Sequence, residues 1–285
     1  MNGLKFFDLH CDTPYVCHEN RLLFDGEKTA VSPAFAECFE EWRQCFAVFV
    51  KDDKEAPFEY YKSVLNDFKK KLKNVPGNLV PYFTVEGGAV IEDDISRLSE
   101  LKKDGICALT LTWNGKNRIA SGCYESGGLT SFVQDVIMEM NRLGMLCDLS
   151  HINEQGFFDA VKIAEYPIAT HSNCKAVFQH PRNLSDEQLK AIAEKSGIIG
   201  ICCYPEFLGC DVFEGIYANI SHLLKLGLEE NIAFGSDFDG AKMDERLDNP
   251  SKIPALAEFL LKKGLKNSLI EKIFYNNSKK CFVCL

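Results

Sequence analysis

One short stretch near the N-terminus reads Phe6-Phe7-Asp8-Leu9-His10-Cys11-Asp12-Thr13, which is typical of a buried strand followed by candidate metal ligands. Residues two apart in a strand point to the same face, so His10 and Asp12 project together, with Asp8 below them. An imidazole beside a carboxylate suits a divalent ion such as zinc. Solvated loops also produce such triplets, so the interpretation depends on where the other candidate ligands fall.

Apolar runs of strand length recur along the chain, and each is followed by a polar turn and a segment of helical periodicity. We expect strands at 4–9, 45–50, 79–86, 106–113, 145–150, 167–171, 198–203 and 232–236. We expect helices near 55–73, 92–103, 130–143, 153–164, 185–196, 213–226, 251–263 and 267–275. Eight such units predict an α/β fold, a closed TIM (β/α)8 barrel, in a single domain over residues 1–285. An open doubly wound sheet is the alternative.

Two local features refine this prediction. Ser185 stands before Asp186-Glu187-Gln188, which is typical of a helix N-cap with an acidic first turn. Residues 13–44 are the least regular part of the chain, and there we expect a loop with one helix over the mouth of the barrel.

The composition is that of an ordinary soluble globular protein, with 46% hydrophobic and 26% charged residues. A formal net charge of -9 and a pI near 5.3 argue against nucleic acid or an anionic membrane as the main partner. The thirteen cysteines lie scattered in apolar runs, which favours a reducing compartment. The first residues do not resemble a signal peptide, and no apolar run approaches the ~20 residues that span a bilayer. We therefore expect a cytoplasmic protein.

Titratable side chains stand at the ends of five expected strands, namely His10 and Asp12, Glu86, Asp148 and His151, His171, and Asp237 and Asp239. The carboxyl ends of parallel barrel strands meet at one face, where the active sites of such barrels lie. Each residue also has a structural alternative. A lone histidine can simply be hydrogen-bonded, Glu86 can cap a strand, and Asp237 and Asp239 can belong to a turn. Asp148 can hold backbone or a histidine in place. Together these positions predict a metal site.

Five or six ligands exceed what one tetrahedral zinc ion needs. Two metal ions ~3.5–4 Å apart, bridged by one carboxylate and a water, fit that number better. The bridging carboxylate should come from a strand between the two ligand sets, which indicates Glu86. The shared water would be acidified to a hydroxide nucleophile. Asp237 is then placed to take its proton and pass it to a leaving group.

The chain carries, in order, the motifs Asp8-Leu9-His10-Cys11-Asp12, Val85-Glu86-Gly87-Gly88, Leu109-Thr110-Leu111-Thr112, Glu139-Met140-Asn141-Arg142-Leu143-Gly144-Met145, Asp148-Leu149-Ser150-His151, Thr170-His171-Ser172, Arg182-Asn183-Leu184-Ser185-Asp186 and Gly235-Ser236-Asp237-Phe238-Asp239-Gly240. In this combination the sequence resembles the membrane dipeptidase (renal dipeptidase) family of binuclear zinc peptidases, peptidase family M19, in its shorter bacterial form. The resemblance covers nearly the whole chain. It implies an α/β barrel of the amidohydrolase kind.

The resemblance also implies a role for each candidate ligand. His10 and Asp12 would bind one zinc ion, and His151 and His171 would bind the other. Glu86 would bridge the two ions and would thereby take part in catalysis.

The same resemblance implies substrate contacts. Asp237 would be the catalytic acid/base near the substrate's amino end, and Arg182 would hold the terminal carboxylate, a task that suits a guanidinium fork. Tyr204 corresponds to a tyrosine that lines the family's pocket. The animal enzymes carry a histidine where this chain has Trp113, followed by Asn114. An indole donates one hydrogen bond but cannot become charged, so the effect of Trp113 on rate and substrate preference is open.

The sequence therefore predicts a zinc-dependent dipeptidase with two Zn²⁺ per chain, which hydrolyses small dipeptides through a metal-bridging hydroxide. Family members often accept a D-residue on the C-terminal side and are thought to dimerise, so both properties are open here. Three alternatives remain. One is another amidohydrolase-type hydrolase, for a lactone, amide or phosphoester. The second is a non-catalytic zinc-binding barrel, for which Trp113 is the only hint. The third is a metal-free enzyme with Asp237 and Glu86 as its acid/base pair.

Overall fold

The computed structural model describes residues 3–25 and 28–283, and its first strand, β1 (Lys5–Asp8), is the strand predicted at 4–9. It pairs in parallel with β2 (Glu41–Phe49) on one side and with β8 (Ile232–Phe234) on the other. Phe6 and Phe7 point to opposite faces of the sheet, and both are fully buried. A strand buried on both faces is typical of a parallel sheet whose outer face is covered by helices.

The other strands are β3 (Leu79–Glu86), β4 (Ile106–Thr110), β5 (Leu146–Asp148), β6 (Pro167–Ile168) and β7 (Ile199–Ile201). The eight strands lie in the order β6-β5-β4-β3-β2-β1-β8-β7. Backbone hydrogen bonds join the region of β6 to that of β7, since Ala169 N donates to Ile198 O (2.9 Å) and Gly200 N to Ala169 O (2.8 Å). The sheet therefore comes round to a nearly closed barrel, as predicted, and is not an open doubly wound sheet.

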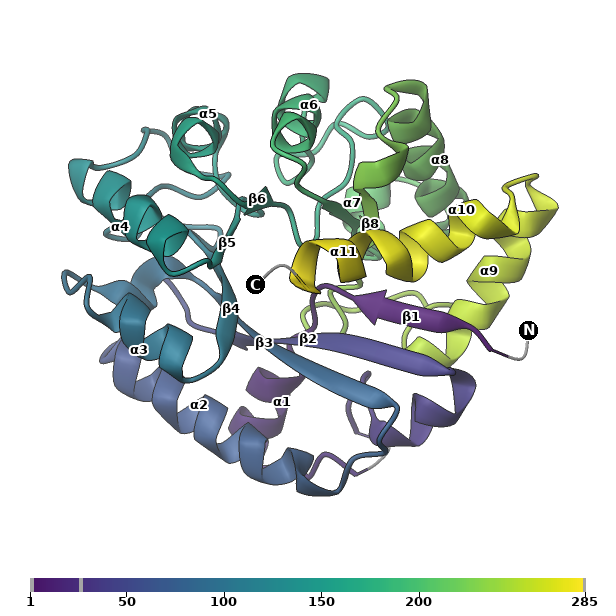
Figure 1. The fold of residues 1–285 in the computed structure, drawn as a ribbon, viewed down its shortest axis with the longest axis horizontal. Coiled ribbons are helices and arrows are strands. Elements are labelled where there is room, and N and C mark those ends of the chain that lie inside the picture. Colours follow the sequence, from purple (N-terminus) through teal and green to yellow (C-terminus); the bar gives the residue numbers. More distant parts are fainter. Residues whose placement is uncertain (1–2, 26–27, 284–285) are drawn as a thin grey trace.

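Helices surround the strands (Figure 1). Those that match predicted helices are α2 (Pro57–Lys71), α3 (Arg97–Lys103), α4 (Ser131–Arg142), α5 (Glu154–Ile163), α6 (Asp186–Glu194), α8 (Val212–Lys225), α9 (Ile253–Lys262) and α10 (Asn267–Glu271). Ser185 caps α6 as predicted, and Gln188 completes a capping box with it. Within the described residues, none of the helices is both long and apolar enough to cross a membrane.

The structure differs from the prediction in three places. The segment 13–44 contains α1 (Thr13–Glu19) and the 3-10 helix η1 (Pro33–Cys38), and its last residues already belong to β2. The short helix α7 (Pro205–Leu208) was not predicted. The last predicted helix does not end at residue 275, because it continues through a π-helical turn, η6 (Lys272–Asn276), into α11 (Asn277–Val283). Short 3-10 turns complete the fold, namely η2 (Leu72–Asn74), η3 (Gly88–Ile91), η4 (Glu229–Asn231) and η5 (Pro250–Lys252).

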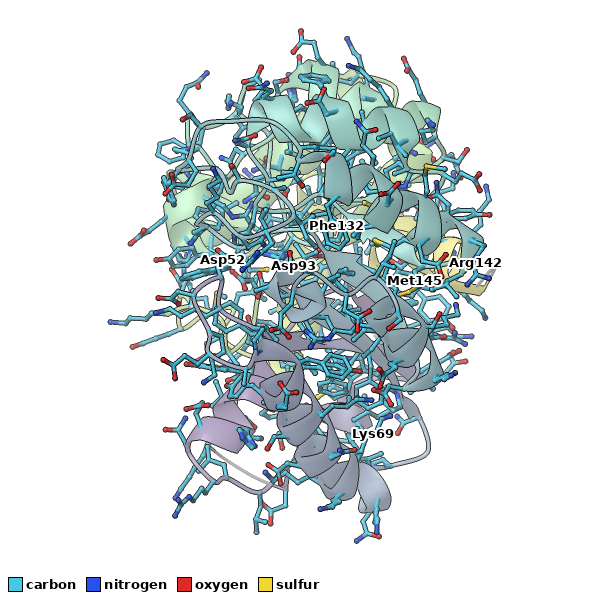
Figure 2. The ribbon with its side chains drawn as sticks, turned by 90° about the vertical axis from the view of Figure 1, so that its left-hand side faces the viewer. Asp52, Lys69, Asp93, Phe132, Arg142 and Met145 are labelled. Carbon is cyan, nitrogen blue, oxygen red and sulfur yellow. The ribbon has the colours of Figure 1, made fainter. Side chains whose placement is uncertain are left out.

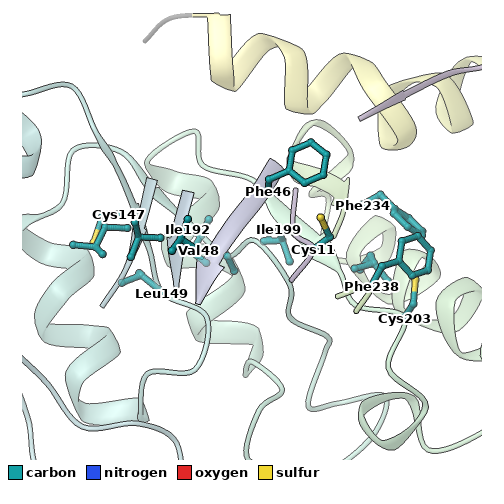
Figure 3. Close-up of a cluster of buried hydrophobic side chains, with 14 of the residues drawn as sticks. Cys11, Phe46, Val48, Cys147, Leu149, Ile192, Ile199, Cys203, Phe234 and Phe238 are labelled. Atoms are coloured by element: carbon teal, nitrogen blue, oxygen red, sulfur yellow. The ribbon is translucent and has the colours of Figure 1, made fainter. Parts of the chain in front are cut away.

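Apolar packing closes one end of the barrel and leaves the other for polar residues. On α11, the ring of Phe282 lies 5.1 Å from Phe7 and 5.6 Å from Tyr82. A larger cluster, part of which is drawn in Figure 3, packs the strands against the helices. In the side view of Figure 2, Asp52, which follows β2, lies at the opposite end from Met145, which precedes β5. The carboxyl ends of the strands therefore point away from α11.

Candidate active site

Glu86, at the end of β3, lies between histidines from three other strand ends. Its Oε2 atom is 3.6 Å from His10 Nε2, while its Oε1 atom is 2.8 Å from His151 Nε2 and 3.5 Å from His171 Nε2. All four side chains are buried. The two carboxylate oxygens thus face two different sets of nitrogen atoms, which is the arrangement expected of a bridging ligand.

Two more carboxylates approach His10 from the loops after β1 and β8. His10 Nε2 is 3.4 Å from Asp12 Oδ2 and 3.9 Å from Asp237 Oδ1. The ligand atoms of these three residues lie within 4.8 Å of one another, and the same holds for His10, Glu86 and His171. His10 belongs to both groups, so the predicted ligands and Asp237 form one continuous cluster.

The donor atoms in this cluster suit a divalent metal. His151 Nε2 and His171 Nε2 are only 2.8 Å apart, and burial lowers the pKa of His151 to about 4 and that of His171 well below its usual range. His151 Nδ1 lies 2.9 Å from the amide oxygen of Asn114, which can only accept, so a proton on Nδ1 is satisfied there and Nε2 is the atom that faces Glu86 and His171. Buried His10 Nε2 and Asp12 Oδ1 also lack hydrogen-bond partners. Buried polar atoms that lack a partner are costly, and a bound cation would give these atoms one.

The charges in the cluster give the same indication. Burial raises the pKa of Asp237 to about 8 and, together with the charge of Glu86, raises that of Asp12 to about 6. Burial also disfavours the charge on Glu86, but the charge of His10 holds its pKa well below the usual range. Against the effect of burial, Glu86 and Asp12 raise the pKa of His10. Three carboxylates therefore share one imidazolium, and a bound cation would favour the ionised form of all three.

The backbone at the cluster is held in uncommon conformations. His151, Asp237 and Asp239 have φ angles of 70°, 66° and 67°, in the left-handed region that non-glycine residues seldom adopt. Such residues gather at functional sites, where the surrounding fold imposes them. At Gly240, a Cβ atom would lie 2.3 Å from Asp12 Oδ2 and 2.4 Å from Asp237 Oδ1. The absence of a side chain there lets both carboxylates reach the cluster.

Asp237, the predicted acid/base, and Asp239, two residues further along, have different partners. Asp239 accepts hydrogen bonds from Thr13 Oγ1 (2.6 Å) and Ala30 N (2.7 Å), so it ties α1 and the following loop to the end of β8. Asp237 faces the histidines instead. Only Asp237 has a carboxylate oxygen close to the candidate ligands.

A pocket of about 220 Å³ opens over this cluster. Its walls include the predicted Trp113 and Tyr204, together with Tyr15, Phe49 and Phe207, which the sequence did not single out. The rings of Tyr15 and Phe49 are 5.3 Å apart, and those of Phe49 and Trp113 are 5.1 Å apart. Pockets for drug-sized ligands are ~300–1,000 Å³, so this aromatic-walled pocket suits a smaller molecule.

Arg182 lies beside the cluster but does not line the pocket. It is 2% exposed, its Nη2 donates to the backbone oxygen of His171 (3.0 Å), and its guanidinium is 5.2 Å from the ring centre of Phe207. Its buried Nε has no hydrogen-bond partner. Among the acidic side chains of residues 3–25 and 28–283, none forms an ion pair with it. A buried guanidinium without a carboxylate partner destabilises the protein unless an anionic ligand forms an ion pair with it.

Comparison with known proteins places this site in a family. The family model described as "Membrane dipeptidase (Peptidase family M19)" matches residues 63–283. An uncharacterized protein in the pqqA 5′ region of Klebsiella pneumoniae is 32% identical in an alignment of 209 residues that covers 68% of this chain and 77% of that protein. An uncharacterized dipeptidase of Schizosaccharomyces pombe is 30% identical in an alignment of 269 residues that covers 89% of this chain but only 62% of that protein.

A solved structure is similar over the whole fold. A metallo peptidase from Rhodobacter sphaeroides, liganded with a phosphinate mimic of the dipeptide L-Ala-D-Ala, has a TM-score of 0.89. The two chains are 22% identical, and the superposition covers 99% of each. At that identity, the similarity concerns the fold.

Proposed function

Since the chain belongs to the membrane dipeptidase family, peptidase family M19, and is a metallo-dipeptidase, we propose that it hydrolyses small dipeptides with two zinc ions. His10 and Asp12 would hold one ion and His151 and His171 the other. The observation that carries this proposal is the placement of Glu86, whose two oxygens face His10 and the His151–His171 pair separately. Imidazole and carboxylate ligands suit zinc.

When bound, the metal ions would polarise the scissile carbonyl and supply an acidified water as the nucleophile. Arg182 would bind the terminal carboxylate of the substrate, because its guanidinium is buried and lacks an acidic partner. Asp237 would move the proton. Its Oδ1 atom lies 3.9 Å from His10 Nε2 and its side chain lines the pocket, so the ionised carboxylate would accept a proton at Oδ1 and give it to the leaving amine.

We propose substrates with small side chains. The pocket of about 220 Å³ is bounded by aromatic rings, which leave little room beyond the cluster. The R. sphaeroides structure holds a mimic of L-Ala-D-Ala, so that dipeptide and L-Ala-L-Ala are the first substrates to compare.

The test is the metal content per chain, together with hydrolysis of both dipeptides before and after chelation. Two zinc ions per chain, chelator-sensitive hydrolysis and recovery on adding zinc are expected. Hydrolysis that persists after complete metal removal would refute the proposal and favour a metal-free acid/base pair. Metal binding without hydrolysis of any dipeptide would indicate a non-catalytic barrel. Activity restricted to a lactone, amide or phosphoester would indicate a different hydrolase.

A further inference from the structure

His171 is connected to a buried carboxylate through one hydroxyl group. Thr170 Oγ1 lies 2.6 Å from Asp148 Oδ2 and 2.9 Å from His171 Nδ1. All three side chains are 1% exposed, so water does not compete for these contacts. Asp148, at the end of β5, thus reaches a candidate metal ligand that follows β6.

The direction of each hydrogen bond follows from counting donors. Asp148 Oδ1 accepts from the backbone N–H groups of Ser150 (3.1 Å) and Thr170 (2.9 Å). Its Oδ2 accepts from the hydroxyl groups of Thr110 and Thr170, each at 2.6 Å. Four donors satisfy an ionised carboxylate, which can only accept. The single proton of the Thr170 hydroxyl therefore points at Asp148, and its oxygen accepts from His171 Nδ1.

A protonated Nδ1 leaves the lone pair of a neutral His171 on Nε2, the atom that faces Glu86 and His151. His151 Nδ1 faces a different acceptor, the amide oxygen of Asn114, at 2.9 Å. The two rings differ in what supports them. His151 is hydrogen-bonded to a neutral amide, whereas His171 is linked to a carboxylate through a hydroxyl group. Such a link raises the basicity of a ligating imidazole.

We propose that Thr170 is a positioning residue that transmits the charge of Asp148 to His171, so that His171 presents its Nε2 lone pair before any metal binds. The role in metal affinity rests on the proposed function, but the tautomer of His171 is a property of the metal-free protein. Partners of this kind are typically worth ~10–100-fold in metal affinity.

The chain offers a matched pair of variants. Thr170→Val and Thr110→Val each remove one hydroxyl that donates to Asp148 Oδ2 at 2.6 Å, with little change of shape. Only Thr170→Val also removes the acceptor of His171 Nδ1. A general loss of support for Asp148 would affect both variants alike, whereas the proposed link would affect only the first.

The first readout is the chemical shifts of the ring nitrogens in the metal-free protein, assigned with His171→Gln. The wild type and Thr110→Val should show His171 with its proton on Nδ1, and Thr170→Val should show a mixture of tautomers. The second readout is zinc affinity measured against a competing chelator, which should fall ~10–100-fold for one ion in Thr170→Val and less than about threefold in Thr110→Val.

Thr170→Ser keeps the hydroxyl and should retain both the tautomer and the affinity, which tests the proposal even if the valine variant does not fold. A wild-type tautomer in Thr170→Val, equal losses in the two valine variants, or a loss in Thr170→Ser would overturn it. Failure of this proposal can be distinguished from failure of the proposed function. Even a chain that neither binds zinc nor cleaves dipeptides would show the tautomer of His171 in its ring-nitrogen chemical shifts.

Discussion

Replacing Arg182 with methionine tests whether the buried guanidinium binds the substrate's carboxylate. In the free protein this side chain makes one hydrogen bond, to the backbone oxygen of His171, and stacks on Phe207. That hydrogen bond, from a charged donor, is worth about 1.5–3 kcal/mol, and the burial of an unpaired charge opposes it. We therefore expect the melting temperature of Arg182→Met to fall by no more than a few degrees, since methionine retains much of the apolar stem.

The catalytic effect should be much larger than the effect on stability. Removing one partner of a buried, hydrogen-bonded charge pair costs about 2–5 kcal/mol, which corresponds to roughly 30-fold to several thousand-fold in kcat/KM. Arg182→Lys keeps the charge but loses the planar fork, so its kcat/KM should lie between those of the wild type and of the methionine variant.

The decisive assay compares each dipeptide with its C-terminal amide, which lacks the carboxylate. If Arg182 binds that carboxylate, the wild type should lose most of its kcat/KM on the amide, and Arg182→Met should lose little more. Equal losses for Arg182→Met on the acid and the amide would refute the reasoning, because the arginine would then act on something common to both substrates. A large fall in melting temperature would likewise show a structural role.

Three further predictions follow from the site and the fold. Gly240→Ala places a Cβ atom within 2.4 Å of the carboxylates of Asp12 and Asp237. The zinc content and kcat of this variant should therefore fall while its far-UV circular dichroism spectrum stays that of the wild type. Asp237→Asn cannot exchange a proton, and kcat should fall ~10²–10⁴-fold while zinc content stays at the wild-type value. Ser185→Ala removes the capping box with Gln188 and should lower the free energy of unfolding by about 1 kcal/mol, measured by denaturant titration, without changing kcat.

The barrel and the gathering of its ligands could be predicted from the sequence because both follow from short-range patterns. Apolar runs of strand length alternate with helical periodicity, and parallel strands bring their carboxyl ends to one face. His10, Glu86, His151 and His171 follow such runs, so their convergence required no knowledge of side-chain contacts. The structure places all four within one buried cluster.

The start of β2 could not be predicted, for a physical reason. Glu41-Trp42-Arg43-Gln44 reads as a polar segment, yet it pairs with β1 along its length. Gln44 is fully buried because its amide donates to Asp8 and its oxygen accepts from the Trp42 indole at 3.1 Å. A polar side chain whose partners come from the same sheet is stable in the core, but the sequence does not reveal those partners.

Three of the aromatic residues in the walls of the pocket were missed for a different reason. Tyr15, Phe49 and Phe207 are aromatic residues in or beside regular elements, where the default interpretation is core packing. Only their position over the cluster distinguishes them from the many aromatic residues that fill the fold. Phe49 is the one that could have been found, because it ends β2 at the same face of the barrel as Glu86 ends β3.

Carboxylates show most clearly what a sequence leaves undetermined. Asp8 and Asp148 precede His10 and His151 by two and three positions, and from spacing alone they are as plausible as ligands as Asp12. In the structure Asp8 accepts from Ser236 N, Ser236 Oγ, Gln44 and His10 N, and Asp148 likewise accepts from four donors. A carboxylate saturated by donors has no lone pair left for an ion, whereas Asp12 Oδ1 has no partner at all. The number of hydrogen-bond donors around each carboxylate oxygen therefore separates two kinds of acid. In one kind both oxygens are already hydrogen-bonded to neighbouring strands, and in the other an oxygen is left that can bind a cation.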